Sequence, residues 1–191
     1  MTSENARPRW QMELPMFFTY LRIVAAPVVM AVLYIPWTWA GWTAAILFFF
    51  GSLTDWADGY FARKFKAEST AGKLMDPIAD KLLVLGPIIM LLAMGRVDAV
   101  MVFLLMARDI FIGGVRSIAA TNQIIIAAKP FGKWKTALQM AGIPCLLIYD
   151  PLFGTVPLAK IGYAALWISV VLSLVSGIQY TAGYFQQSKR R

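Results

Sequence analysis

The chain of 191 residues has no histidine and only one cysteine, Cys145. These absences exclude a histidine base, histidine metal ligands, an internal disulfide and a zinc site built from several thiolates. The sequence also lacks a Walker A loop and a G-x-G-x-x-G fingerprint, so we do not expect it to hold a nucleotide as soluble enzymes do. Charged residues make up only 15% of the chain, against about 25% in an average soluble domain. Carboxylates acting with a hard divalent cation are therefore the natural candidates for catalysis.

What the chain has in excess is apolar surface. Hydrophobic residues make up 59% of it, and its mean hydropathy is +0.64. A helix that crosses a bilayer needs about 20 mainly apolar residues. Six stretches approach that length: roughly 16–35, 41–62, 74–94, 97–118, 134–149 and 155–183. We therefore predict an all-α membrane protein with six transmembrane helices, divided into an N-terminal interfacial segment (1–15), a six-helix catalytic domain (16–185) and a basic C-terminal tail (186–191).

The basic residues predict the orientation of these helices, because cytoplasmic loops are enriched in lysine and arginine. With the N-terminus inside, the outer connections contain only Arg96 and Lys160. The inner side collects the following residues: Arg7, Arg9, Arg63, Lys64, Lys66, Lys73, Arg116, Lys129, Lys133, Lys135, Lys189, Arg190 and Arg191. We expect both termini to be cytoplasmic, and this asymmetry explains much of the net charge of +8 without a nucleic-acid partner. A cleaved signal peptide is the competing interpretation of the N-terminus, but the apolar run is long and no clear cleavage site ends it.

Four aspartates stand in or beside two of the apolar stretches. Each charged residue at the centre of a membrane helix costs about 2.5–3.5 kcal/mol on insertion scales, so such a cluster needs a compensating partner. Asp55 and Asp58 are three residues apart and Asp76 and Asp80 are four apart, which places each pair on one helical face. Two such faces brought together form a pocket of carboxylate oxygens, which suits Mg²⁺ or Mn²⁺.

Other interpretations of these acids remain open at this point. Asp76 precedes Pro77, a pattern typical of a helix N-cap followed by proline at the first helical position. Asp58 can also pair with an interfacial lysine or arginine. A divalent-cation channel or carrier is a different class of function, because acids in membrane helices often line ion paths. A non-catalytic scaffold is disfavoured, because packing alone does not require four aspartates.

Small residues and one arginine accompany the acids. Gly59 and Arg63 are four residues apart, and Gly72 precedes Asp76 by four. Small residues allow a bulky ligand to approach the backbone, and an arginine can bind a phosphate through two parallel hydrogen bonds. Together with a metal site, this pattern predicts a substrate that carries a pyrophosphate.

These residues resemble the signature of the CDP-alcohol phosphotransferase family, D-x2-D-G-x2-A-R-x8-G-x3-D-x3-D. The chain fills all eight fixed positions at the correct spacing: Asp55, Asp58, Gly59, Ala62, Arg63, Gly72, Asp76 and Asp80. The resemblance implies a homodimeric membrane enzyme that transfers a phosphatidyl-type group from a CDP-linked donor to an alcohol and releases CMP. It also implies two metal ions (Mg²⁺ or Mn²⁺) held by the four aspartates, with Asp80 as the general base. Gly59, Ala62, Arg63 and Gly72 would line the CDP site.

A second set of polar residues concerns the acceptor alcohol. Arg108 and Asp109 lie inside the fourth apolar stretch, and Arg116 follows on nearly the same face. Lys133, Lys135 and Thr136 begin the fifth stretch. We expect Arg108, Arg116, Lys133, Lys135 and Thr136 to bind an acceptor that carries a phosphate. The alternatives are that the lysines only satisfy the charge asymmetry between the two sides, and that Arg108 pairs with Asp109 rather than with a substrate.

Three stretches resemble bacterial members of the family whose acceptor is glycerol 3-phosphate: residues 19–23, 107–110 and 132–136. Arg22, in the first of these, is expected to face the headgroup pocket, although Met16 stands where the usual pattern has asparagine. The resemblance implies CDP-diacylglycerol as the donor and a bacterial inner-membrane enzyme whose active site faces the cytoplasm. The nearest alternative is a cardiolipin synthase of the same family, which uses phosphatidylglycerol as its acceptor.

Overall fold

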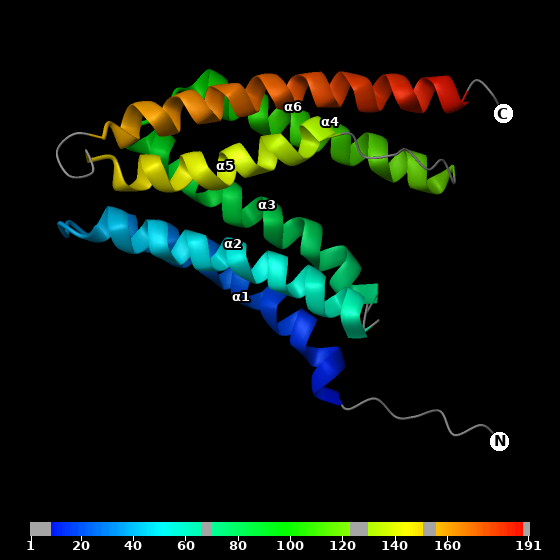
Figure 1. Cartoon of the computed structure of the whole chain (residues 1–191), viewed down its shortest axis with the longest axis horizontal. Helices are drawn as coiled ribbons and strands as arrows, with labels where there is room; N and C mark the ends of the chain where they lie inside the picture. The colour runs from blue at the N-terminus through cyan, green and yellow to red at the C-terminus, as the bar shows by residue number, and fades with distance from the viewer. Residues whose placement is uncertain (1–8, 66–69, 123–129, 151–155, 189–191) are drawn as a thin grey trace. The chain divides into compact units, whose positions relative to one another are not determined.

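The structure is a computed structural model, and it describes the backbone of residues 9–65, 70–122, 130–150 and 156–188. The side chains of residues 9–15, 55–65, 70–74, 77, 130 and 131 are outside that description. Secondary structure in the described part is essentially helical, as predicted. Its six helices are α1 (Arg9–Tyr34), α2 (Ala40–Phe65), α3 (Thr70–Ala93), α4 (Ala99–Thr121), α5 (Pro130–Ile148) and α6 (Leu158–Ser188) (Figure 1).

Each of the six predicted stretches corresponds to one helix, and all six helices are longer than the apolar runs that predicted them. Helix α1 begins at Arg9 and continues without a break through residue 15, the predicted end of the interfacial segment. Helix α3 begins at Thr70, six residues before Asp76. The interpretation of Asp76 as an N-cap is therefore wrong, because Asp76 lies inside the helix.

Residues up to Met90 form one compact unit, in which α1 packs along α2. Its buried side chains include Val29 of α1, Phe48 of α2 and Leu83 of α3. Glycine permits close approach of α3 to α2, because a Cβ atom added at Gly51 would lie 3.0 Å from a methyl carbon of Leu83. The unit thus includes α2 and the part of α3 up to Met90, the two helices on which the motif lies.

Residues from Leu91 onward form the second unit, in which α6 packs against both α4 and α5 (Figure 1). The contact between α5 and α6 is close because it is made at two glycines. A Cβ atom added at Gly162 would lie 2.7 Å from the carbonyl oxygen of Gly142 and 2.8 Å from Leu146. Buried Ile143 and Leu166 complete this contact.

Polar contacts fix the turn before α4 to the other helices of the second unit. The backbone N–H of Met101 donates to the Asp98 carboxylate at 2.8 Å, which caps α4. This hydrogen bond keeps the pKa of Asp98 below its usual range. The Tyr163 hydroxyl also donates to Asp98 at 2.9 Å, and Arg96 donates to the carbonyls of Leu146 and Leu147 at the end of α5. Arg96 thereby complements the negative end of that helix dipole.

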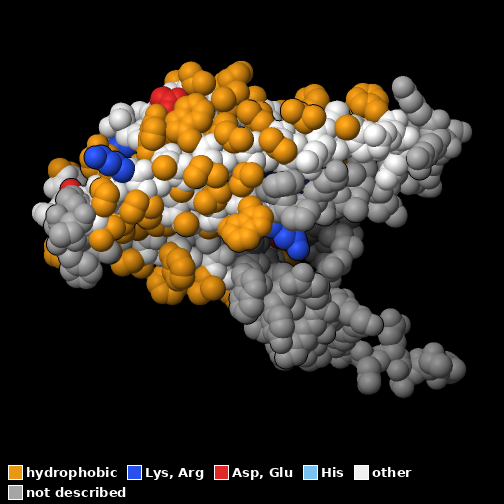
Figure 2. Space-filling model, turned by 45° about the horizontal axis from the view of Figure 1, so that its top comes forward, with side chains coloured by type: hydrophobic (Ala, Val, Ile, Leu, Met, Phe, Trp, Pro, Cys, Tyr) orange, Lys and Arg blue, Asp and Glu red, His pale blue; other side chains and the backbone are white. Residues whose placement is uncertain are grey.

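The described exterior is unusually apolar. Large side chains such as Phe103, Ile110 and Ile178 are 67%, 68% and 71% exposed. Figure 2 shows hydrophobic side chains spread over the described part of one face, with few charged ones among them. Contiguous apolar surface of this kind is rare on soluble monomers. By length and composition, two described helical stretches suffice to cross a membrane, Met16–Tyr34 and Leu158–Ser188.

Candidate functional site

The eight motif positions fall on the end of α2 and the beginning of α3. Helix α2 runs to Phe65 and therefore includes Asp55 and Asp58, while α3 includes Gly72, Asp76 and Asp80. Helical spacing within each acidic pair, on which the predicted metal site depends, is thus present. The side chains of Asp55 and Asp58 lie outside the described part. The same holds for the four residues predicted to line the CDP site: Gly59, Ala62, Arg63 and Gly72.

Asp76 and Asp80 both contact polar side chains of α1. The Thr19 hydroxyl donates to Oδ1 of Asp76 at 2.5 Å, and the Arg22 guanidinium forms an ion pair with Oδ1 of Asp80. Thr19 and Arg22 are only 2% and 1% exposed, whereas the Asp80 side chain is 47% exposed. The sequence indicated Arg22 for the headgroup pocket, whereas Thr19 was only part of the stretch 19–23 and was given no role of its own. The sequence feature that could have indicated both contacts is that Thr19 and Arg22 are polar and stand three residues apart within an apolar run.

The donor chemistry of this site fits a hard divalent cation. Asp76 and Asp80 present carboxylate oxygens from the same side of α3, one helical turn apart. The contacts given above involve only Oδ1 of each residue. Asp76 and Asp80 alone do not make a group of three or more acidic, histidine or cysteine ligands, and the side chains described here contain no such group. Asp55 and Asp58 would have to supply the remaining ligands.

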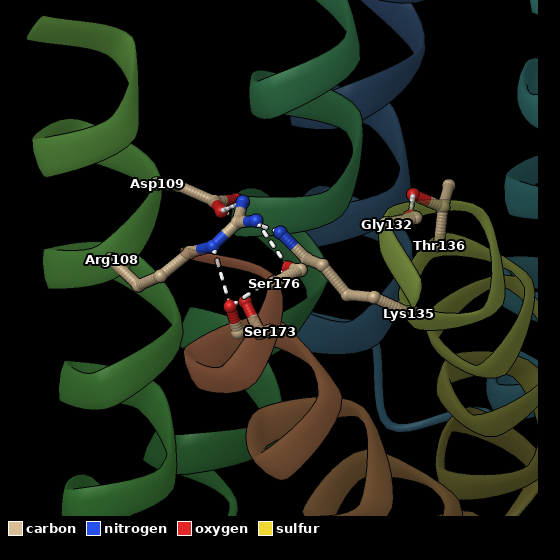
Figure 3. A network of polar contacts seen from close by, with 7 residues as sticks. All are labelled: Arg108, Asp109, Gly132, Lys135, Thr136, Ser173 and Ser176. Carbon is tan, nitrogen blue, oxygen red and sulfur yellow. Dashed lines mark hydrogen bonds and ion pairs between the residues drawn. The ribbon is translucent and has the colours of Figure 1, made fainter. Parts of the chain in front are cut away.

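A second polar cluster lies in the other unit, where α4, α5 and α6 meet (Figure 3). The Asp109 carboxylate accepts from Arg108 Nη1 at 3.0 Å and from Lys135 Nζ at 2.5 Å. Arg108 also donates to the carbonyl oxygen of Ser173 at 2.9 Å and to the Ser176 hydroxyl at 2.7 Å. The pairing of Arg108 with Asp109 is confirmed. One carboxylate thus balances two cations, and the cluster carries a net positive charge.

The other predicted acceptor residues lie around this cluster with less burial. Arg116 is exposed and its guanidinium stacks over the ring of Tyr180 at 5.5 Å. Lys133 is exposed on α5. The Thr136 hydroxyl donates to the Gly132 carbonyl at 3.3 Å, and Figure 3 shows these two residues apart from the cluster. Of the five, only Arg108 and Lys135 are brought together by direct contacts with a shared partner.

Buried polar atoms of α5 and α6 add to the polarity of this unit. Nε2 of Gln139 and the hydroxyls of Ser169 and Ser173 have no hydrogen-bond partner among the described residues. Gln139 stands one helical turn after Lys135 and is 3% exposed. A buried polar group without a partner costs about 1–3 kcal/mol. Water or a polar ligand that bonded to these atoms would remove that cost.

Comparison with known proteins gives the family. Residues 12–175 match the family described as CDP-alcohol phosphatidyltransferase, and the match includes the eight motif positions and Arg108, Asp109 and Lys135 of the second cluster. The chain belongs to this family. The resemblance predicted from the motif is therefore confirmed, and so is the prediction of an enzyme rather than a carrier or a scaffold. Members of the CDP-alcohol phosphatidyltransferase family are membrane-bound and generally use divalent metal ions.

Three similar members of the CDP-alcohol phosphatidyltransferase family come from different bacteria. The protein of Rickettsia bellii is 37% identical, with 87% of this chain and 92% of its own length covered. The Bacillus subtilis protein is 35% identical, with the same coverage. The Shigella flexneri protein is 32% identical, with 89% of this chain and 93% of its own length covered. Each is named CDP-diacylglycerol–glycerol-3-phosphate 3-phosphatidyltransferase.

Proposed function

We propose that this protein transfers the phosphatidyl group of CDP-diacylglycerol to sn-glycerol 3-phosphate, yielding phosphatidylglycerophosphate and CMP. This is the reaction of bacterial phosphatidylglycerophosphate synthase. The observation that carries the proposal is the similarity to relatives of that name over nearly nine-tenths of the chain. The positively charged cluster on α4 and α5 supports it, because an acceptor that is itself a phosphate ester requires cations that a neutral alcohol does not.

The eight motif residues have three proposed roles: they bind metal ions, bind the CDP group and accept a proton. Asp55, Asp58, Asp76 and Asp80 hold two divalent ions, Mg²⁺ or Mn²⁺, and Gly59, Ala62, Arg63 and Gly72 line the site of the CDP group. The ions, when bound, neutralise the diphosphate of the donor and stabilise the attacking and leaving oxygens. Asp80 accepts the proton of the acceptor hydroxyl as its oxygen attacks the donor phosphorus, and the bond to CMP breaks. The half-exposed side chain of Asp80 supports this role.

The α4–α6 cluster binds the phosphate of the acceptor. Arg108 and Lys135 are its central residues because Asp109 already holds both in fixed positions. Three exposed residues near the cluster also bind the acceptor: Arg116, Lys133 and Thr136. The orphaned polar atoms of Gln139 and Ser173 support a polar ligand in this unit, since glycerol phosphate offers hydroxyl and phosphate oxygens to bond with them.

The proposed setting is the bacterial inner membrane. All six helices span it, both termini are cytoplasmic, and the site faces the cytoplasm. Residues 1–15 lie at the interface, and the basic tail 186–191 interacts with anionic lipid headgroups. The enzyme acts as a homodimer, contacts membrane lipid and binds no nucleic acid. The two long apolar stretches and the apolar exterior support this setting.

A panel of acceptors tests the proposed function. Purified protein with CDP-diacylglycerol and a divalent cation is expected to release CMP when glycerol 3-phosphate is added. It is not expected to do so with inositol, choline, ethanolamine or phosphatidylglycerol. CMP release with phosphatidylglycerol alone would instead identify a cardiolipin synthase. Activity with another alcohol but not with glycerol 3-phosphate would keep the family and refute the named reaction.

Replacing the buried lysine of the cluster should weaken acceptor binding selectively. We expect Lys135→Met to raise the KM for glycerol 3-phosphate by about 10–100-fold, because a hydrogen bond to a charged group contributes about 1.5–3 kcal/mol. The KM for CDP-diacylglycerol should stay within about threefold. Lys160→Met is the matched control, since Lys160 is an exposed lysine of the same unit and is not among the proposed acceptor residues. Equal effects of the two substitutions on the KM for glycerol 3-phosphate would contradict the assignment of Lys135.

A further inference from the structure

The polar contacts between α1 and α3 match in register. Thr19 and Arg22 are three residues apart on one face of α1, and Asp76 and Asp80 are four apart on one face of α3. Thr19 contacts the first aspartate and Arg22 contacts the second. Residues at these spacings follow one another along a helix face. Two contacts one turn apart therefore hold the two helices together at the level of the motif.

The two α1 residues that make these contacts, Thr19 and Arg22, are almost completely buried. A guanidinium that is 1% exposed inside an apolar helix bundle requires a counter-ion, and Asp80 supplies it. Arg22 approaches one oxygen of Asp80, while nearly half of the aspartate side chain remains accessible. Arg22 itself is too buried to reach a substrate in solution. Its described contact is with the Asp80 carboxylate, through which it can act on the site.

We infer that Thr19 and Arg22 of α1 are positioning residues that orient the Asp76 and Asp80 carboxylates toward the metal and the acceptor hydroxyl. The inference deepens the proposed function and rests on it. Polar partners that orient metal-ligating groups typically change metal affinity by about 10–100-fold when they are removed. In this chain those partners come from a helix that carries none of the eight motif residues.

Two physical effects of removing Arg22 have opposite signs, which makes the inference testable. Loss of a positive charge near a cation site would by itself tighten cation binding, because like charges repel. Loss of an orienting partner would instead weaken it, because the carboxylate then rotates among several rotamers. The sign of the change in cation affinity therefore separates positioning from simple electrostatic competition.

The experiment measures Mn²⁺ binding to the purified full chain without substrates, together with kcat and KM for glycerol 3-phosphate. For Arg22→Gln we expect about 10–100-fold weaker Mn²⁺ binding and a kcat lowered at least tenfold, with the KM for glycerol 3-phosphate within about threefold. Arg22→Lys, which keeps the charge but loses the planar fork, should fall between this variant and the wild type. Thr19→Val should weaken Mn²⁺ binding, and Thr19→Ser should restore it.

Unchanged or tighter Mn²⁺ binding in Arg22→Gln would overturn the inference for Arg22. If that variant does not fold, Arg22→Lys and the Thr19 pair decide the question, because neither removes the buried charge. Wild-type values of kcat and Mn²⁺ affinity in both Arg22→Lys and Thr19→Val would overturn the inference as a whole. A wild-type protein that binds Mn²⁺ but releases no CMP with glycerol 3-phosphate would refute the proposed function instead.

Discussion

Asp80→Asn should lower kcat by at least about 10²–10⁴-fold, the range that general acid–base catalysis typically contributes. Asparagine has nearly the same shape as aspartate but accepts no proton at neutral pH and is a poorer ligand for a hard cation. Binding of CDP-diacylglycerol should persist, because three of the four motif aspartates and the proposed CDP-site residues remain. The measurement is single-turnover CMP release together with equilibrium binding of the donor lipid.

The ion pair with Arg22 requires a specific control for this variant. Asp80→Asn removes one negative partner of the buried Arg22 guanidinium. Because nearly half of the Asp80 side chain is exposed, we expect the loss of stability to be smaller than the about 3–5 kcal/mol typical of a fully buried pair. The double variant Arg22→Gln/Asp80→Asn removes both charges and should recover thermal stability without recovering turnover. If it recovers turnover, or if Asp80→Asn alone retains near-normal kcat, Asp80 is not the general base.

Removing divalent cations should abolish turnover in the wild type. Without cations, the negative diphosphate of the donor would approach four carboxylates, and this repulsion opposes both binding and reaction. Loss of a single oxyanion-stabilising donor typically costs about 10²–10³-fold in kcat, so we expect at least that loss on chelation. Thermal stability should also fall, because an ion that binds only the folded state stabilises it. CMP release and thermal unfolding, each with and without chelator, give the measurement.

Asp98→Asn provides the matched control for this dependence. Asp98 caps α4 outside the motif, and asparagine is an equally good N-cap, so this replacement should leave both the cation requirement and the stability nearly unchanged. Full activity of the wild type in excess chelator would contradict the role of the cations. Restoration by Mg²⁺ or Mn²⁺ after chelation should be complete, since no covalent change is involved.

The helices were predictable because apolar run length is a local property of the sequence. Their ends were not, as α2 and α3 show. Charged residues such as Arg63 and Lys73 limit an apolar run, yet the backbone stays helical to Phe65 and again from Thr70. A membrane helix can extend past the apolar core because its hydrogen bonds are internal to the segment. The N-cap interpretation of Asp76 was wrong because α3 already begins at Thr70. The Asp-Pro pattern is local and does not show whether the residues before it are helical.

The placement of each acidic pair on one helical face was likewise predictable. The side chains that contact Asp76 and Asp80 were not. Asp76 meets Thr19 across 57 residues and Asp80 meets Arg22 across 58, and such contacts depend on how the helices pack. The Arg108–Asp109 pair joins neighbours in sequence and was foreseen as one of two alternatives. Lys135 reaches the same carboxylate across 26 residues. The sequence indicated Lys135 for the acceptor site together with Lys133, but it gave no local signal that Lys135 would contact Asp109.

Equilibrium binding of Mn²⁺ to the purified protein in detergent, counted by electron paramagnetic resonance, tests the central claim most directly. The claim is that the acidic faces of α2 and α3 together hold divalent ions. Two ions should bind per chain in the wild type and in Asp98→Asn, and neither should bind when all four motif aspartates are replaced by asparagine. A wild-type protein that binds no ion, or a fourfold variant that binds as many as the wild type, would contradict the account.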